Sequence, residues 1–202
     1  MIYWPLKDPN RTIKNYYYKC EDNFLNAEEC QFLIRFGKSL PMQQGVVSVA
    51  YNNDDYVVDE SIRKANISWL EPSPQTEWIY KKVQSSIEHV NSNYFNLDLE
   101  FLEALQFSEY TEDQSFFGKH LDVNTKMVSN CIRKLSFTVQ LSEEHSYTGG
   151  DLITHSNSSG NIMTRTQGSI IFFPSHILHE VTPVTQGTRH SLVGWVYGKP
   201  LR

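Results

Sequence analysis

Cysteine is scarce in this sequence, with three residues, Cys20, Cys30 and Cys131, among 202. Their number is odd and none of them forms a CxxC pair, which argues against a disulfide framework and against a thiolate metal site. The sequence also has no apolar run long enough to cross a membrane. Its first ten residues lack the basic start and the apolar stretch of a signal peptide. These absences predict a soluble protein of a reducing cytoplasm.

An excess of basic residues is likewise absent. The formal net charge is -5, the sequence pI is about 5.8, and lysine and arginine are scattered along the chain. A nucleic-acid-binding surface normally needs clustered positive charge, so we expect no nucleic-acid partner and no membrane partner. Hydrophobic residues make up 40% of the chain, and neither a repeat nor a low-complexity segment divides it. We therefore expect one domain, residues 1–202.

The first half of the chain shows helical spacing. Asn26 followed by Glu29 predicts a helix N-cap with its capping box, and Pro41 predicts the end of that helix. A second helix is predicted to begin near Thr76. The apolar residues expected on the buried sides of these helices are Phe32, Leu33, Phe36, Leu40, Trp78, Ile79, Val83, Ile87 and Val90. Helices are thus expected to support the domain over about residues 1–95.

Beyond about residue 100 the pattern changes to short β-rich runs separated by glycine and proline. The predicted strands are residues 101–110, 134–141, 151–155, 169–173, 177–182 and 189–197. Residues 46–51 are a further strand candidate, and the tyrosines at 16–18 are expected on an edge strand. Helices followed by many short strands predict a fold that is mainly β with flanking helices, a sandwich or jelly roll with its core at about 96–202.

Two polar segments, residues 52–60 and 123–130, carry few apolar side chains that could anchor them. Loops of this kind often cover an active site and change conformation when a substrate binds. We therefore expect both segments to be mobile and to close over a substrate.

The pair His120 and Asp122 is the first candidate for chemistry. In an extended segment, residues two apart point to the same side, so an imidazole and a carboxylate can converge on one metal ion. A motif this short arises often by chance, and taken alone the pair is better explained by a surface histidine beside a turn aspartate. A metal site needs a further ligand from elsewhere in the sequence.

His179 is the candidate for that further ligand. It alternates with Ile177 and Val181 in a β-rich segment, which places its side chain on the inner side of the strand. His176 is a rival, but it lies in a turn that begins at Pro174, where its side chain is expected to point away. Two histidines and one carboxylate form the facial triad of non-haem Fe(II) oxygenases, which leaves three coordination positions open.

Arg189 supplies an independent signal. A predicted turn at residues 183–188 leads into a strand in which Arg189, Ser191 and Trp195 share one face. A buried unpaired guanidinium is costly, so an inward arginine needs an anion, and no acidic residue near it in the sequence offers one. The distal carboxylate of a metal-bound 2-oxo acid would satisfy it, with a hydroxyl group of Ser191 or Tyr110 as a second donor.

Three segments resemble one protein family. They are FSEYTEDQSFFGKHLD from Phe107, RKLSFTVQLSEEHSYTGGDL from Arg133 and HEVTPVTQGTRHSLVGWVYG from His179. Together they are similar to the prolyl 4-hydroxylase-type 2-oxoglutarate oxygenases, and in particular to small bacterial and phage members called PKHD-type hydroxylases. The resemblance implies a double-stranded β-helix core and the cofactors Fe(II), 2-oxoglutarate and dioxygen, with ascorbate as a candidate accessory.

The resemblance also implies roles for single residues. Tyr110 matches a tyrosine that hydrogen-bonds the distal carboxylate of 2-oxoglutarate, Leu152 a leucine that lines the pocket, and Trp195 a tryptophan of the pocket wall. An ordinary core position is the alternative to the cosubstrate role for Tyr110. For Trp195, a core position is compatible with a place in the pocket wall. The glycine often found between that tyrosine and the His-x-Asp pair is displaced here, with Asp113 and Gln114 in its neighbourhood. This departure concerns the substrate rim and not the metal site.

By the same resemblance, the reaction is hydroxylation of an unactivated C–H bond, with 2-oxoglutarate converted to succinate and carbon dioxide. The implied substrate is a prolyl residue in a peptide or protein, while a free amino acid or another side chain stays open. Two other classes of protein are alternatives: a non-catalytic jelly-roll module that binds carbohydrate, and a cupin-type metal hydrolase. Neither would require an inward arginine beside a His-x-Asp pair and a distal histidine.

Overall fold

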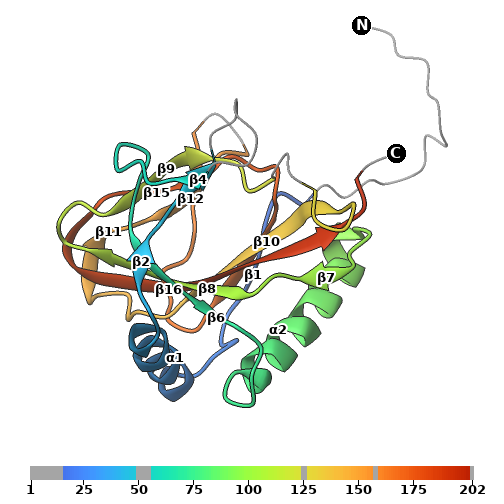
Figure 1. Cartoon of the computed structure of the whole chain (residues 1–202), viewed down its shortest axis with the longest axis horizontal. Helices are drawn as coiled ribbons and strands as arrows, with labels where there is room; N and C mark the ends of the chain where they lie inside the picture. The colour runs from blue at the N-terminus through green and yellow to red at the C-terminus, as the bar shows by residue number, and fades with distance from the viewer. Residues whose placement is uncertain (1–15, 49–55, 124–126, 157–158, 201–202) are drawn as a thin grey trace, which may run out of the picture.

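The computed structural model describes residues 16–48, 56–123, 127–156 and 159–200 (Figure 1). It contains two antiparallel sheets packed face to face, and two helices that cover the outer side of the larger sheet. Within the described ranges, neither helix is long and apolar enough to cross a membrane. The predicted fold class, mainly β with flanking helices, is confirmed.

The larger sheet holds nine strands. Seven of them lie side by side in the order β1 (Lys19–Glu21), β14 (Ile170–Pro174), β10 (Ile132–Gln140), β16 (Val184–Gly198), β8 (Leu105–Thr111), β6 (Asn66–Leu70) and β2 (Gln43–Gln44). The other two, β7 (Phe101–Leu102) and β11 (Tyr147–Gly149), pair with opposite ends of β16. At 15 residues β16 is the longest strand, and it pairs with four others.

The smaller sheet has five strands. Their order is β13 (Asn161–Ile162), β12 (Leu152–Thr154), β15 (His179–Val181), β9 (Phe116–His120) and β5 (Arg63–Lys64). Two short strands, β3 (Val47–Ser48) and β4 (Tyr56–Val57), form a separate pair. Side chains of the nine-stranded and the five-stranded sheet meet in one apolar cluster that includes Tyr110, Leu152, Phe173 and Val181. This is the layered arrangement of a jelly roll.

The two sides of the nine-stranded sheet differ in polarity. Toward the helices its strands present apolar residues such as Phe107, Phe137 and Leu192, all of them fully buried. Strand alternation places polar residues on the opposite, inner side, and these are also buried: Gln106, Ser108, Ser136, Thr138, Gln140, Arg189 and Ser191. Because buried polar groups need partners, this inner wall indicates a binding site between the two sheets.

The first helix, α1 (Ala27–Ser39), begins as the sequence predicts. The side-chain oxygen of Asn26 accepts a hydrogen bond from the backbone N–H of Glu29 at 2.9 Å, and the Glu29 carboxylate accepts one from the backbone N–H of Asn26 at 2.9 Å. The second helix, α2 (Glu77–Val90), continues into a short π-helix, η1 (Asn91–Phe95). Both predicted helices are confirmed.

We expect Asn26→Ala to lower the free energy of unfolding by about 1 kcal/mol, because it removes the cap of an otherwise free N–H in the first turn. Urea unfolding followed by circular dichroism measures this change. Glu28→Ala is the matched control, since Glu28 is exposed in the same turn but lies outside the capping box. Equal losses of stability in the two variants would contradict a specific role of the cap.

The sequence does not predict all of the strands. β5 and β6 lie in the first half of the chain, where mainly helices are predicted. β5 nevertheless belongs to the five-stranded sheet and β6 to the nine-stranded sheet. The predicted turn at residues 183–188 is wrong, because β16 runs through it from Val184. Pairing with β11 satisfies the backbone there, and Gly187 takes a positive φ of 70°. The register of β11 on β16 shifts at this point, which accommodates the irregular backbone.

Three further segments differ from their predictions or lie partly outside the described residues. The tyrosines at 16–18 precede the edge strand, which begins at Lys19, and Tyr16 packs edge-on against Tyr94 with ring centroids 5.0 Å apart. Of the predicted strand 46–51, β3 forms part, and residues 49–51 lie outside the described ranges. The same holds for 52–55 and 124–126, so the closing of the two polar segments over a substrate stays a prediction.

Candidate active site

Three potential metal ligands meet between the sheets. His120 ends β9, His179 begins β15, and Asp122 follows β9. The His120 Nε2 atom lies 3.6 Å from one carboxylate oxygen of Asp122, and the His179 Nε2 atom lies 3.4 Å from the other. One ligand atom from each of the three residues falls within 4.8 Å of the other two. Ligand atoms at right angles around a first-row metal lie about 3 Å apart, so this donor set is close to the spacing that such an ion requires.

The pairing of β9 with β15 explains why these side chains meet. His179 is the register partner of His120, and the register shifts between His179 and Val181. The chain after β9 is held by Ser175, whose carbonyl oxygen accepts hydrogen bonds from the backbone N–H groups of Asp122 and Val123 at 3.0 Å each. Backbone hydrogen bonds therefore fix all three candidate ligands, although His179 is far from His120 and Asp122 in the sequence.

Each histidine has one ring nitrogen committed to a backbone carbonyl. The Nδ1 atom of His120 lies 2.8 Å from the carbonyl oxygen of Gly118, and that of His179 lies 2.9 Å from the carbonyl oxygen of Ile177. A carbonyl only accepts, so each Nδ1 donates its proton and each neutral ring keeps a free lone pair on Nε2. Ligating histidines are usually oriented in this way. Both lone pairs are thus available to a metal at the Asp122 carboxylate.

The charges of the site also suit a cation. Burial is the main cause that lowers the pKa of His120 to about 3, and the nearby His179 imidazole adds to it, so the His120 ring is neutral at physiological pH. Burial alone would raise the pKa of Asp122, but His179, His120 and a hydrogen bond from Ser136 outweigh it and hold that pKa below its ordinary value. Asp122 is therefore an ionised carboxylate, 7% exposed, beside a neutral imidazole. The residues present fit a divalent ion with mixed nitrogen and oxygen ligands.

Arg189 lies on the inner wall of the nine-stranded sheet with a single hydrogen-bond partner. Only 1% of its surface is exposed, and its Nη2 atom donates to the amide oxygen of Gln140 at 2.9 Å. Its Nε and Nη1 atoms are buried without a partner. The guanidinium lies 5.4 Å from the ring centre of Tyr110, its register partner on β8. A buried cation that meets only an amide and an aromatic ring is incomplete without an anion.

The other predicted pocket residues line the same interior. Ser191 and Trp195 follow Arg189 on the inner face of β16, and the Ser191 Oγ and Trp195 Nε1 atoms are buried without a partner. Leu152 is 3% exposed and belongs to the same apolar cluster as Tyr110. The structure places all five side chains in the interior, four from the nine-stranded sheet and Leu152 from the five-stranded sheet. Their functional roles stay predictions.

The rival histidines lie elsewhere. His176 is exposed in the turn before β15, which removes it from the site. The His155 Nε2 atom lies 2.8 Å from the carboxylate of Glu180, which directly follows His179 on β15. His190 faces the helices, where its Nε2 atom lies 3.1 Å from the Glu109 carboxylate.

Gln114 lies in the turn between β8 and β9. Its φ of 66° lies in the left-handed region that favours glycine. The neighbouring Asp113 stabilises this turn, because its carboxylate accepts hydrogen bonds from Thr111 and Ser115 at 2.7 Å each.

Sequence reasoning missed three polar residues of this region. Gln140 is the partner of Arg189. Arg133 lies 4.0 Å above the Trp195 ring and donates to the Glu103 carboxylate at 2.7 Å. Arg63 is 6% exposed on β5 and lies over the ring of Phe117, which itself stacks on His120. The polar alternation of Ser136, Thr138 and Gln140 in a predicted core strand was a usable signal for Gln140; Arg63 and Arg133 had none.

Comparison with known sequences places this site in a family context. Residues 105–197 match the model of the 2OG-Fe(II) oxygenase superfamily. PKHD-type hydroxylases of Idiomarina loihiensis and Synechococcus elongatus are 36% identical over 81 residues and 39% identical over 98 residues. The alignments cover 40% and 47% of this chain, and 36% and 43% of the two relatives. The chain thus matches less than half the length of these curated relatives.

Solved structures share the fold over most of the chain. A viral collagen prolyl hydroxylase of Paramecium Bursaria Chlorella virus-1 has a TM-score of 0.66 at 18% identity, over 91% of this chain and 97% of its own. A Pseudomonas putida prolyl-4-hydroxylase has a TM-score of 0.64 at 21% identity, over 91% and 94%. A Trichoplax adhaerens prolyl hydroxylase, in complex with a hypoxia inducible factor peptide, has 0.70 at 18% identity, over 90% and 84%. The resemblance to prolyl 4-hydroxylase-type 2-oxoglutarate oxygenases is confirmed.

Proposed function

We propose that this chain, similar in sequence and fold to prolyl 4-hydroxylase-type oxygenases, is an Fe(II)- and 2-oxoglutarate-dependent dioxygenase that hydroxylates an unactivated C–H bond. One observation carries the proposal: the buried Arg189 guanidinium, with two unpartnered nitrogen atoms, lies in the same interior as the His120, Asp122 and His179 triad. A metal site alone would fit a hydrolase, and a polar interior alone would fit a binding module. A metal site together with a buried carboxylate receptor fits a metal-bound dicarboxylate.

Each residue has a separate task in this proposal. His120, Asp122 and His179 hold Fe(II), and the hydrogen bonds to the Gly118 and Ile177 carbonyls keep both Nε2 atoms directed at it. Arg189 binds the distal carboxylate of 2-oxoglutarate through the nitrogen atoms that lack partners.

The remaining pocket residues complete the interior. Tyr110 and Ser191 offer hydroxyl groups near that carboxylate, and Leu152 and Trp195 exclude water from the walls. Fe(II), 2-oxoglutarate and dioxygen supply the oxidising chemistry, in which one oxygen atom enters succinate and the other enters the substrate, with release of carbon dioxide. The protein positions the reactants, provides charged groups that bind them and excludes water from the site.

The proposed substrate is a prolyl residue in a peptide or protein. Three proteins of similar fold are prolyl hydroxylases, and one of them was solved in complex with a peptide fragment. The alternative is a free amino acid or another side chain. Aerobic incubation of candidate peptides with the iron-loaded protein and 2-oxoglutarate, followed by mass spectrometry, decides the matter. The gain of one oxygen atom on a single prolyl residue supports the proposal, while a gain on a free amino acid alone contradicts the peptide substrate.

Gln140→Glu is expected to weaken the binding of 2-oxoglutarate by at least about ten-fold, because a carboxylate next to Arg189 would neutralise the guanidinium before the ligand arrives. Isothermal titration of the manganese-loaded protein with 2-oxoglutarate measures the affinity. Gln106→Glu is the matched control, since Gln106 is a buried amide on the same wall that bonds to Ser108 and not to an arginine. A similar loss in both variants would mean that any added charge in the interior disturbs the site.

A further inference from the structure

A second arginine, Arg63, is buried near the metal triad and has no acidic partner among the residues that the structure describes. It is 6% exposed, its Nη1 atom donates to the Val46 carbonyl oxygen at 3.2 Å, and its Nε atom has no partner. No acidic oxygen of the described residues lies within ion-pair distance of its guanidinium. A buried guanidinium in this state is costly unless another group completes it.

The other buried or half-buried arginines show that this state is unusual for the chain. Arg133 is paired with Glu103 at 2.7 Å, and Arg165 is paired with Asp151 at 3.4 Å. Arg63 and Arg189 alone lack an acid among these four. They lie on opposite sheets, Arg63 on β5 and Arg189 on β16, with the triad in the interior that both sheets enclose. Arg133 and Arg165 thus each have an acid, whereas Arg63 and Arg189 have none within the described ranges.

Arg63 is close to the chemistry. Its register partner in the sheet is Phe117, and its guanidinium lies 4.5 Å from the Phe117 ring centre. The Phe117 ring stacks on the His120 ring with centroids 3.5 Å apart. Burial lowers the pKa of Arg63 most strongly, and the charge of Asp122 is among those that oppose it. One aromatic ring thus separates this cation from a candidate metal ligand.

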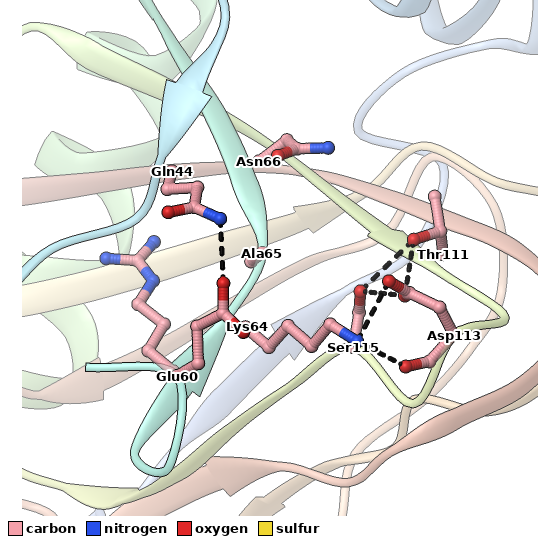
Figure 2. Close-up of a pocket in the computed structure, with 9 residues that line it drawn as sticks. Gln44, Glu60, Lys64, Ala65, Asn66, Thr111, Asp113 and Ser115 are labelled. Carbon is pink, nitrogen blue, oxygen red and sulfur yellow. Dashed lines mark hydrogen bonds and ion pairs between the residues drawn. The ribbon is translucent and has the colours of Figure 1, made fainter. Parts of the chain in front are cut away.

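A small pocket lies beside Lys64 and Glu60 (Figure 2), and Arg63 is one of the residues that line it. It has a volume of about 70 Å³, and Arg63 lines it together with residues of β2, β5, β6 and the β8–β9 turn. The other charged groups there already have partners: Lys64 Nζ lies 3.0 Å from the Asp113 carboxylate, and the Gln44 amide donates to Glu60 at 2.8 Å. The pocket suits one small polar group and is too small for a whole peptide residue. Glu60 is exposed to solvent, so the guanidinium is the buried charge of this pocket that has no counter-ion among the described residues.

Charge balance indicates what that group is. In the proposed loaded site, Asp122 and one carboxylate of 2-oxoglutarate offset the two charges of Fe(II), and Arg189 offsets the other carboxylate. Arg63 is left over, so the loaded site is one positive charge in excess. An anionic group on the substrate that is hydroxylated would neutralise the extra positive charge. A carboxylate suits this role, because its planar shape matches the guanidinium fork.

We propose that Arg63 binds a carboxylate of the substrate that is hydroxylated, either the carboxyl group of a free amino acid or chain end, or an acidic side chain beside the target residue. This inference rests on the proposed function, because it takes the triad and Arg189 as the iron and 2-oxoglutarate sites. Arg63 fixes the substrate from the five-stranded sheet, opposite the wall that holds the cosubstrate.

Acetate and acetamide test this directly, because they have the same shape and differ in charge. The protein is held in excess over Mn(II) and saturated with 2-oxoglutarate, which occupies Arg189 and allows no turnover. Paramagnetic broadening of the methyl NMR signal then reports binding near the metal. We expect saturable broadening of acetate and little of acetamide, and roughly a ten- to hundred-fold weaker acetate affinity in Arg63→Met. Arg165→Met is the control, since Arg165 also stacks on an aromatic ring, 4.2 Å from Tyr147, and should leave acetate binding unchanged.

Gly45→Ala provides a second variant that keeps the charge. A methyl group at Gly45 would overlap the Arg63 Nε atom, so the guanidinium must move aside while the backbone of Gly45 needs no change. Acetate affinity should fall and the affinity for 2-oxoglutarate should stay within about two-fold. Equal broadening by acetate and acetamide, or equal acetate affinity in Arg63→Met, overturns the proposal.

Two further measurements separate the possible outcomes. If 2-oxoglutarate does not bind to the manganese-loaded protein at all, the proposed function itself fails, and a separate calorimetric titration shows this. Competition against acetate distinguishes the sources of the carboxylate. Displacement by L-proline but not by an amidated peptide with an internal glutamate indicates a free carboxyl group, and the reverse indicates an acidic side chain.

Discussion

Asp122→Ala will abolish iron-dependent succinate formation, with a loss well beyond a hundred-fold. Loss of a group that merely orients a ligand costs about 10- to 100-fold in metal affinity or activity, and Asp122 is the only carboxylate of the triad. The fold should persist, because the backbone N–H of Asp122 keeps its bond to Ser175 and a buried charge is removed. Succinate release at saturating 2-oxoglutarate and thermal unfolding of the metal-free protein are the two measurements.

Glu180→Gln is the matched control for that variant. Glu180 is a neighbouring acid beside His179, but its carboxylate pairs with His155 and takes no part in the triad. It should retain activity close to that of the unmodified protein. Near-normal succinate formation by Asp122→Ala would show that the triad is not the iron site. A loss of the fold would show instead that the carboxylate has a structural task.

Arg189→Ala will raise the concentration of 2-oxoglutarate needed for half-saturation by roughly ten- to a hundred-fold, because a charge-assisted hydrogen bond to a carboxylate contributes about 1.5–3 kcal/mol. Iron affinity should change little, since Arg189 lies on the opposite sheet from the two histidines. Calorimetric titration of the metal and of 2-oxoglutarate, each carried out separately, distinguishes the two ligands.

Arg189→Lys refines this test. A lysine keeps the positive charge but loses the planar fork, and it cannot bond to Gln140 and the ligand in the same geometry. Its 2-oxoglutarate affinity should lie between those of the unmodified protein and of Arg189→Ala. Equal losses of iron and 2-oxoglutarate affinity in Arg189→Ala would mean that this arginine supports the fold and does not bind the cosubstrate.

The candidate site could be predicted from the sequence where it depends on local alternation. His120 and Asp122 are two residues apart, His179 alternates with apolar residues, and Arg189 does the same on its own strand. Each of these patterns fixes the side of a strand that a residue faces, and the structure places all four in one interior. Local periodicity suffices for this because the alternation of a strand has a fixed period.

The partners of these residues could not be predicted, because they depend on which strands pair and in which register. Gln140 meets Arg189 only because β10 pairs with β16, and Arg63 reaches Phe117 only because β5 pairs with β9. In each pair the two residues are about 50 positions apart, and the local sequence around one residue does not indicate which strand it will pair with. For the same reason, the short strands β5 and β9 escaped prediction, since tertiary pairing and not propensity makes them strands.

The placement of Arg189 on β16 has a consequence for local unfolding. β16 pairs with β8 over Thr188–Val193, which includes Arg189, and with β10 from Ser191 onward. The three metal-ligand candidates lie instead at or just beyond the ends of short strands in the five-stranded sheet. Backbone amides around Arg189 should therefore exchange with deuterium only when the whole domain unfolds, and those near His120 and Asp122 through small openings of much lower free energy. His120 and Asp122 would then leave and regain their positions through local fraying, while Arg189 stays in place until the domain unfolds.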